Sequence, residues 1–411
     1  MKKISIIGGG IIGLCSAYYL AKEGHQVVVF DKSDMSDGCS YGNAGMIVPS
    51  HVIPLAQPGM IAQGVRWMFD SQSPFYVKPR WDADLIKWGW QFYKHANYKH
   101  VEKSMPALRD LSLLSKDLYQ DFARNNNSFF YEEKGLLMLY KTDKVGEEIR
   151  SEGEKAAFLG LEVDYLSKAD ISRLETGTKT DVFGGVHYKS DAHLCPQKFM
   201  QFIKEELKRM NVKIQSNTLV NDFIIHNSTI SDVVTDKGVF TTDEVVLASG
   251  SWSLELAKKL NINISVLPGK GYSFTLRDQK QKPVIPSILC EGKVAVTPMD
   301  NVIRFGGTME ITHTKDTKIN QKRLQGIVNT VNGFYPDLKI EVPNEKDTWY
   351  GFRPCTPSGL PIISRDKKIK NVTFATGHSM MGLSLAPATG KIIAEIISGK
   401  VTSITTTMFQ L

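Results

Sequence analysis

The first 31 residues carry the pattern that most constrains the fold of this chain. Two short apolar runs, Ile4–Ile7 and Gln26–Phe30, are typical of buried parallel strands. Between them, helical periodicity extends over Ile12–Lys22, and Gly24 ends it. The sequence therefore predicts a strand–helix–strand unit at the N-terminus.

Three glycines join the first strand to the helix in the spacing G-x-G-x-x-G. Gly8 permits a tight turn, Gly10 lets the backbone approach a pyrophosphate, and Gly13 lets helix and strand pack closely. The helix N-terminus offers free N–H groups to phosphate oxygens. Asp31 follows Gly13 by 18 residues, at the position where a carboxylate binds ribose hydroxyls. These features predict a dinucleotide site, for either FAD or NAD.

The segment after this unit, "DMSDGCSYGNAGMIVPS", is rich in small and polar residues such as Ser40, Asn43 and Gly45. A loop of this composition can surround a phosphate or a flavin ring with backbone N–H groups. A flexible surface loop has the same composition, so both interpretations stay open at this point.

Two further apolar runs end in glycine and continue as helices. The run "EVVLASG" breaks at Gly250 and leads into "SWSLELAKKL". The run Val372–Ala375 meets Gly377, and a turn around Gly382 leads into a C-terminal helix whose first turn is expected to contain Pro387. The three strand–glycine–helix joints can share one ligand only if the nucleotide domain is assembled from separated segments.

Composition argues against several other classes of protein. The chain has 411 residues, of which 42% are hydrophobic and 23% charged, as in ordinary globular proteins. It shows no run of 18 uncharged apolar residues, and its start reads as a strand, so we expect a cytoplasmic protein without a membrane-spanning helix. The net charge of +7 comes from scattered basic residues, which argues against a nucleic-acid partner. Five separated cysteines without a C-x-x-C pair indicate free thiols and no metal site.

The segment 66–95 combines aromatic and basic side chains and holds four of the six tryptophans. Trp, Lys and Arg favour the surface of a membrane, so peripheral contact with the inner membrane is one interpretation. Packing between domains is the other. Oligomerisation stays open.

Four motifs taken together resemble the FAD-dependent D-amino acid oxidase superfamily, and most closely its bacterial D-amino acid dehydrogenase small-subunit and glycine oxidase branch. They are "IIGGGIIGLCSAYYLAKEGHQVVVFDK", "VVLASGSWS", "GFRPCTPSGLPII" and "GHSMMGLSLAPATGKIIAEII". The resemblance covers both ends and the middle joints, whereas residues between them match loosely.

The resemblance implies an α/β fold in which a discontinuous Rossmann-like FAD-binding domain (1–50, 150–265 and 346–411) accompanies an α+β antiparallel-sheet substrate or cap domain (51–149 and 266–345). It implies FAD as cofactor. Some relatives attach the flavin through a cysteine that aligns near Gly351 here, so we expect FAD to be bound non-covalently.

The implied FAD contacts follow the four motifs and the small-residue loop. They are Ile11, Ile12, Asp31, Lys32, Cys39, Ser40, Ala44, Gly45, Met46, Val220, His378, Ser379, Met380, Met381, Gly382, Leu383 and Ser384, with Asn43, Ala248, Gly250, Trp252 and Gly377 from the loop and the joints.

Arg353 matches the arginine that binds the substrate carboxylate in the family. A guanidinium binds a carboxylate through two parallel hydrogen bonds, and residues 349–363 contain no acid that could pair with it. A structural ion pair with a distant acid is the alternative. Tyr272 and His51 are weaker pocket candidates, and His51 is equally consistent with a satisfied interior histidine.

The reaction implied is oxidation of a D-amino acid, with D-proline or hydroxy-D-proline as narrower options, to an imino and then a 2-oxo acid by hydride transfer to flavin N5. The expected electron acceptor is a quinone or another acceptor. The alternatives are an oxygen-dependent glycine- or sarcosine-type amine oxidase and a flavin electron-transfer subunit without a substrate of its own.

Overall fold

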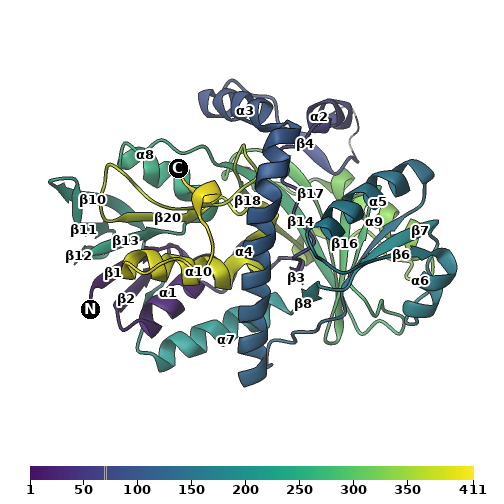
Figure 1. Ribbon diagram of the computed structural model, residues 1–411, viewed down its shortest axis with the longest axis horizontal. Coiled ribbons are helices and arrows are strands. Elements are labelled where there is room, and N and C mark those ends of the chain that lie inside the picture. Colours follow the sequence, from purple (N-terminus) through teal and green to yellow (C-terminus); the bar gives the residue numbers. More distant parts are fainter. Residues whose placement is uncertain (69, 71) are drawn as a thin grey trace.

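The computed structural model describes residues 1–68, 70 and 72–411. Among these residues, the strands form a six-stranded sheet, a nine-stranded sheet and two smaller sheets. The six-stranded sheet lies on the left of Figure 1 and the nine-stranded sheet on the right, and the long helix α4 (Tyr98–Asn125) runs between them. Phe69 and Ser71, which belong to the segment 66–95, lie outside the described residues.

The six-stranded sheet is built around the predicted N-terminal unit. In spatial order its strands are β19 (Ile362–Arg365), β20 (Val372–Thr376), β13 (Glu244–Leu247), β1 (Lys3–Ile7), β2 (Gln26–Phe30) and β9 (Lys213–Gln215). Strands β20 to β9 are parallel, and β19 pairs antiparallel with β20. A parallel sheet with crossover helices confirms the predicted α/β fold.

The nine-stranded sheet is mixed. In spatial order it contains β18 (Thr348–Cys355), β14 (Leu267–Arg277), β17 (Val302–Ile311), β16 (Val294–Met299), β15 (Ser287–Leu289), β5 (Leu136–Tyr140), β7 (Gly184–Tyr188) and β6 (Val163–Ser167), with β4 (Phe75–Val77) beside β17. The smaller sheets are β10 (Val220–His226) with β11 (Thr229–Thr235) and β12 (Gly238–Thr241), and β3 (Met46–Ile47) with β8 (Ala192–His193).

Helices cover both large sheets. They are α1 (Ile11–Lys22), α2 (Met60–Met68), α3 (Ala83–His95), α4, α5 (Asp143–Phe158), α6 (Lys168–Leu174), α7 (Pro196–Arg209), α8 (Ser253–Lys259), α9 (Gln321–Phe334) and α10 (Gly382–Ser398), with short 3-10 turns η1 (Gly250–Trp252), η2 (Glu345–Asp347), η3 (Ser379–Met381) and η4 (Thr407–Phe409).

Sheet membership differs from the predicted domain boundaries at two places. Strands β6 and β7 fall within 150–265, which we assigned to the FAD-binding domain, yet β7 pairs with β5 and β6 pairs with β7 in the nine-stranded sheet. Strand β18, near the start of 346–411, pairs with β14 in the same sheet. Pairing across the sheet depends on long-range contacts that local periodicity does not report. The division into two domains stays a prediction.

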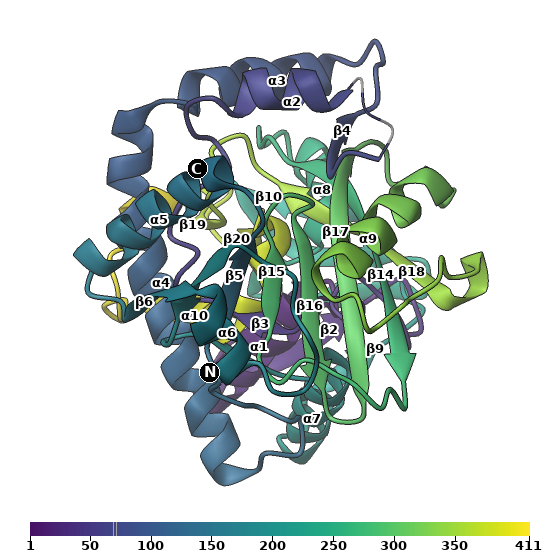
Figure 2. The ribbon, with the colours of Figure 1, turned by 90° about the vertical axis from the view of Figure 1, so that its right-hand side faces the viewer.

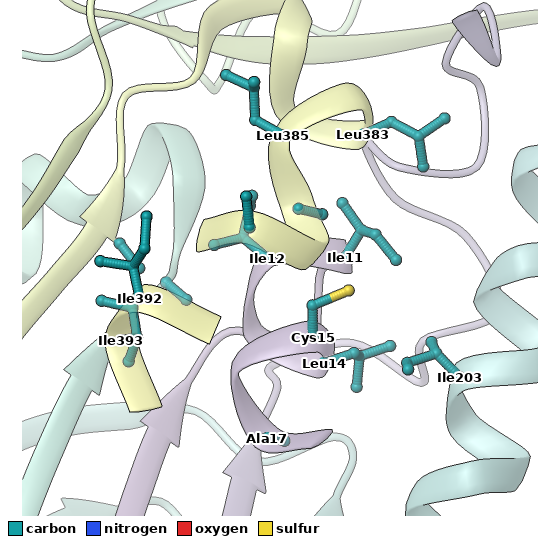
Figure 3. Close-up of a cluster of buried hydrophobic side chains, with 14 of the residues drawn as sticks. Ile11, Ile12, Leu14, Cys15, Ala17, Ile203, Leu383, Leu385, Ile392 and Ile393 are labelled. Carbon is teal, nitrogen blue, oxygen red and sulfur yellow. The ribbon is translucent and has the colours of Figure 1, made fainter. Parts of the chain in front are cut away.

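The core of the six-stranded half forms where α1 packs against α10 (Figure 3). The two backbones approach so closely that a Cβ on Gly390 would lie 2.5 Å from the carbonyl carbon of Cys15. By length and composition, Ser379–Ser398 is apolar enough to cross a membrane, with a mean hydropathy of 1.3, but 72% of it is buried inside the protein. That burial is typical of a core helix.

Pro387 lies inside α10 and not in its first turn, so this detail of the prediction is wrong. Proline lacks an N–H donor, and its ring leaves the carbonyl four residues earlier without a helical partner. That carbonyl belongs to Leu383, and it accepts a hydrogen bond of 2.6 Å from the Tyr119 hydroxyl of α4. A contact from a distant helix thus satisfies the group that the proline exposes.

Candidate active site

The three strand–glycine–helix joints meet at one edge of the six-stranded sheet. They follow β1, β13 and β20, which are adjacent and parallel, so their carboxyl ends lie together. In open α/β sheets, ligands bind in the crevice outside these carboxyl ends. Segments separated by more than 100 residues therefore surround the same space, as the sharing of one ligand requires.

A cavity of about 1880 Å³ opens at this edge and extends to the nine-stranded sheet. Every residue named above as a cofactor or substrate contact lines it, except Gly13, Gly45, Gly377 and Ser384. A Cβ on any of the three glycines would come within 2.5 Å of a neighbouring atom, and the Ser384 hydroxyl accepts a hydrogen bond from the N–H of Val48. These four residues support the walls of the cavity.

The start of α1 fits a bound pyrophosphate. Gly10 is the residue before the helix, and it has no side chain that could cap the helical N–H groups. A Cβ built on Gly10 would meet only the Ser40 hydroxyl oxygen, at 3.7 Å. The N–H of Ile11 donates to that hydroxyl (3.0 Å), whereas no side chain among the described residues caps the next turn. Uncapped helical N–H groups beside open space are what a phosphate needs.

Asp31 and Lys32 lie at the end of β2, as predicted. The Asp31 carboxylate accepts hydrogen bonds from the N–H groups of Gly9 (2.7 Å) and Ser33 (2.8 Å). The Lys32 ammonium stands 3.7 Å from the ring centre of Trp252, a cation–π contact that links the end of β2 to the second joint. Burial lowers the pKa of Lys32 from its ordinary value.

Arg353 reaches the cavity from β18. Its Nη1 donates a hydrogen bond to the carbonyl oxygen of Thr308, and no carboxylate lies within ion-pair distance of the guanidinium in the described part of the chain. Burial lowers the pKa of Arg353 from its ordinary value. An arginine next to an open cavity and without a protein counter-ion is a site for a ligand anion.

The guanidinium lies against Gly271 of β14. A Cβ at Gly271 would come within 2.4 Å of Arg353 Nη1. We therefore expect Gly271→Ala to displace the guanidinium and raise the KM for the substrate about tenfold or more, because a misplaced cation loses its bidentate contact. FAD absorbance should be unchanged. Steady-state kinetics together with the flavin spectrum check this, and an unaltered KM would contradict the placement.

Tyr272 lines the cavity, but its hydroxyl already has partners. It donates a hydrogen bond of 2.6 Å to Glu310 and accepts one from the N–H of Asn320 at 3.2 Å. Burial, followed by the hydrogen bond to Glu310, raises the pKa of Tyr272. Tyr350, its cross-strand neighbour in β18, also lines the cavity and makes no side-chain hydrogen bond among the described residues. Of these two tyrosines, only Tyr350 has a hydroxyl without a partner in the described part of the chain, and the sequence analysis did not name it.

His51 also lines the cavity, where its ring is partly buried. Burial, with a smaller contribution from the charge of Lys293, lowers the pKa of His51 to about 4, so the imidazole is neutral near pH 7. Its Nδ1 lies 3.2 Å from the Ser50 hydroxyl oxygen, and Nε2 has no hydrogen-bond partner among the described residues. This arrangement leaves one ring nitrogen available to a ligand.

The cysteines near the cavity have the properties of inert thiols. Burial raises the pKa of Cys355 to about 11 and also raises that of Cys39. Because the thiolate is the nucleophile, both positions are poorly suited to attack a flavin. These properties support the expectation of non-covalent FAD.

Three comparisons with known proteins agree with this geometry. The family model described as "FAD dependent oxidoreductase" (DAO) matches residues 3–396. A D-amino acid dehydrogenase of Helicobacter pylori is 30% identical over 397 residues, covering 96% of this chain and 94% of that protein. A D-amino acid dehydrogenase of Vibrio atlanticus is 31% identical over 410 residues, covering 98% and 97%.

Solved structures share the fold. Glycine oxidase from Geobacillus kaustophilus superimposes with a TM-score of 0.78 at 22% identity, covering 100% of this chain and 99% of that chain. L-proline dehydrogenase from P. horikoshii gives a TM-score of 0.76 at 21% identity, covering 100% and 96%. The chain belongs to the DAO family of FAD-dependent oxidoreductases.

Proposed function

We propose that this enzyme oxidises D-amino acids to imino acids, which water hydrolyses to 2-oxo acids, and that a quinone accepts the electrons. The observation that carries the proposal is Arg353, a guanidinium beside the cavity with no carboxylate partner among the described residues. Relatives that match nearly the whole chain are named D-amino acid dehydrogenase, which supports this substrate class.

In this proposal the chain's own residues mainly bind and orient. Arg353 takes the substrate carboxylate through two parallel hydrogen bonds. The joints at Gly10, Gly250 and His378 hold the cofactor against the same cavity. FAD, when bound, supplies a two-electron acceptor. Positioning of the substrate Cα–H and exclusion of water are then the contributions of the protein.

The experiment that tests the proposal is anaerobic titration of the holoenzyme with a panel of D- and L-amino acids, including D-proline and hydroxy-D-proline. Bleaching of the flavin by D-amino acids is the expected result. Bleaching by none of them would support the electron-transfer subunit. Preferential bleaching by glycine or sarcosine, with peroxide formed in air, would favour the oxidase alternative, which the fold shared with glycine oxidase suggests.

The proposal of a quinone as electron acceptor is based on an exposed aromatic surface at one end of the molecule. Helices α2 and α3 both lie at the top of Figures 1 and 2, away from the two large sheets. Side chains exposed there include Trp81 (100%), Ile86 (61%) and Trp90 (59%), with Lys94 over the Trp90 ring at 5.2 Å. Residues of α2 such as Arg66 line the cavity, and the same helix exposes Val65 (52%).

We expect the variant Ile86→Ser/Trp90→Ser to bind anionic lipid vesicles about tenfold more weakly than the wild type, because two large apolar groups no longer enter the bilayer surface. Co-sedimentation with vesicles measures this. Phe158→Ser is the matched control, since Phe158 is 90% exposed on α5, outside this surface. Equal sedimentation of all three proteins would argue against membrane contact.

A further inference from the structure

The fully buried carboxyl of Asp191 is connected to His51, at the cavity, through the hydroxyl of Ser50. Asp191 precedes β8 and is 0% exposed. Its Oδ2 accepts a hydrogen bond of 2.5 Å from the Ser50 hydroxyl, and its Oδ1 accepts one of 3.0 Å from the Ser50 N–H. The Ser50 hydroxyl oxygen in turn lies 3.2 Å from His51 Nδ1. Asp191, Ser50 and His51 therefore form a continuous hydrogen-bonded chain that ends at the cavity.

The Asp191 carboxyl has no other side-chain contact that would explain its burial. Among the described residues, its oxygens accept hydrogen bonds only from Ser50, and no cation lies within ion-pair distance. Burying a carboxylate without a cation is costly, so such a group is a candidate for function. The hydrogen bonds also link its protonation to the tautomer of His51.

The protonation state of Asp191 determines which group donates each hydrogen bond between Asp191, Ser50 and His51. When Asp191 is ionised, Ser50 donates to it, so the Ser50 oxygen accepts from His51 Nδ1–H and Nε2 carries a free lone pair. When Asp191 is protonated, it donates to Ser50, Ser50 donates to Nδ1, and Nε2 carries the hydrogen. The imidazole is neutral in both states.

We propose that this hydrogen-bonded chain of Asp191, Ser50 and His51 removes the proton of the substrate ammonium group. In it, His51 Nε2 is the acceptor facing the cavity and Asp191 is the final proton site. One proton moves from the ammonium to Nε2, one from Nδ1 to the Ser50 oxygen, and one from Ser50 to Asp191. The ammonium becomes a neutral amine, the carboxylate becomes a carboxylic acid, and no imidazolium forms. His51 is the catalytic residue, and Ser50 and Asp191 act through it. The inference rests on the proposed amino acid substrate.

The acidities of the groups favour Asp191 over His51 as the final proton site. Burial raises the pKa of Asp191 to about 7, opposed by the hydrogen bonds from Ser50 and the charge of Lys116 on α4. An imidazolium at His51 is disfavoured, because burial and Lys293 lower its pKa to about 4. Other titratable groups in this region include Tyr188 on β7, which feels the charges of Asp191 and of Glu152 on α5. Asp191 should therefore be ionised and ready to accept above about pH 7.

The test compares wild type with Asp191→Asn, which keeps the shape but cannot ionise, by anaerobic flavin reduction across pH. The probe is the amino acid that bleaches the wild type fastest. Wild-type kred/Kd should fall about tenfold per pH unit below 7. In Asp191→Asn the fall should instead begin at the higher pKa of the substrate ammonium, because only free amine then reacts. The variant should be at least tenfold slower at pH 7.5 and approach the wild type near pH 10, where water deprotonates the ammonium. Ser50→Ala should show the same pH profile as Asp191→Asn. The rate losses of the two substitutions should not add in the Ser50→Ala/Asp191→Asn double variant.

Ser190→Ala is the matched control, because the Ser190 hydroxyl is buried beside Asp191 without a partner among the described residues. It should keep the wild-type profile. A second readout needs no activity. Ionisation of Asp191 destabilises the wild type as pH rises toward 7, so the unfolding temperature of Asp191→Asn relative to wild type should increase between pH 5 and 8.

The outcomes separate the two proposals. An Asp191→Asn profile that superimposes on the wild type, or an unfolding difference that does not vary with pH, would overturn the proton chain while the proposed function stands. Failure of every amino acid to bleach wild-type flavin would overturn both.

Discussion

Replacing Arg353 with leucine is expected to weaken substrate binding by about 100- to 1,000-fold while FAD stays bound, because the substrate carboxylate loses its buried charge-assisted partner. The residue contacts Thr308 and Gly271 but no protein carboxylate among the described residues. Leucine should therefore leave the fold intact, and removal of a partly buried cation that has no counter-ion among the described residues should keep or raise the unfolding temperature of the protein without substrate. The Kd from anaerobic flavin reduction and the flavin spectrum measure both effects.

Arg277→Leu provides the control for loss of positive charge. Arg277 lies on β14, the same strand as Gly271, but it is exposed and does not line the cavity. Its substrate Kd should equal that of wild type. An Arg353→Leu enzyme with a near-normal Kd would show that the carboxylate binds elsewhere.

The second large effect is expected at Gly10. In Gly10→Ala the new Cβ would meet only the Ser40 hydroxyl oxygen, at 3.7 Å, so the protein should fold normally. The methyl group would nevertheless occupy the space where the pyrophosphate approaches α1. We expect FAD affinity to fall at least about 100-fold, since the phosphates lose close contact with the helix N-terminus. Fluorescence titration of the unloaded protein with FAD measures this change.

Two further glycine variants separate binding from folding. In Gly13→Ala the Cβ would lie 1.9 Å from the carbonyl oxygen of Gly8, so this variant should lose stability as well as FAD. Gly89→Ala, on the exposed face of α3, meets no atom within 4 Å and should be neutral or slightly stabilising. Normal FAD affinity in Gly10→Ala would contradict the position assigned to the pyrophosphate.

Local sequence patterns were sufficient for the nucleotide-binding half. The strand Gln26–Phe30 is observed with the predicted bounds, and the helix predicted over Ile12–Lys22 begins one residue earlier. Such patterns work here because strand, turn and helix are consecutive, and each is encoded by periodicity or by a glycine. The convergence of the three joints could also be predicted, since parallel strands place their carboxyl ends at one edge.

Other features depend on contacts between distant residues. The interior Pro387 is tolerated only because Tyr119 satisfies the freed carbonyl. No local pattern reports such a contact.

The candidate site shows the same limit. Ser50 and Asp191 are 141 residues apart, and their hydrogen bonds exist only because the loop after β3 meets the segment before β8. The sequence analysis found His51 but not its partners, and it named Tyr272 but not Tyr350. A tyrosine can donate a hydrogen bond to a ligand only if its hydroxyl does not already donate to another group. The Tyr272 hydroxyl already donates to Glu310.

The most direct test of the account is a crystal structure of the FAD-loaded enzyme, reduced anaerobically and soaked with a D-amino acid. We predict that the amino acid carboxylate makes two parallel hydrogen bonds to the Arg353 guanidinium, with the flavin ring in the same cavity. A carboxylate bound away from Arg353, or a guanidinium paired with a carboxylate of the protein, would contradict it.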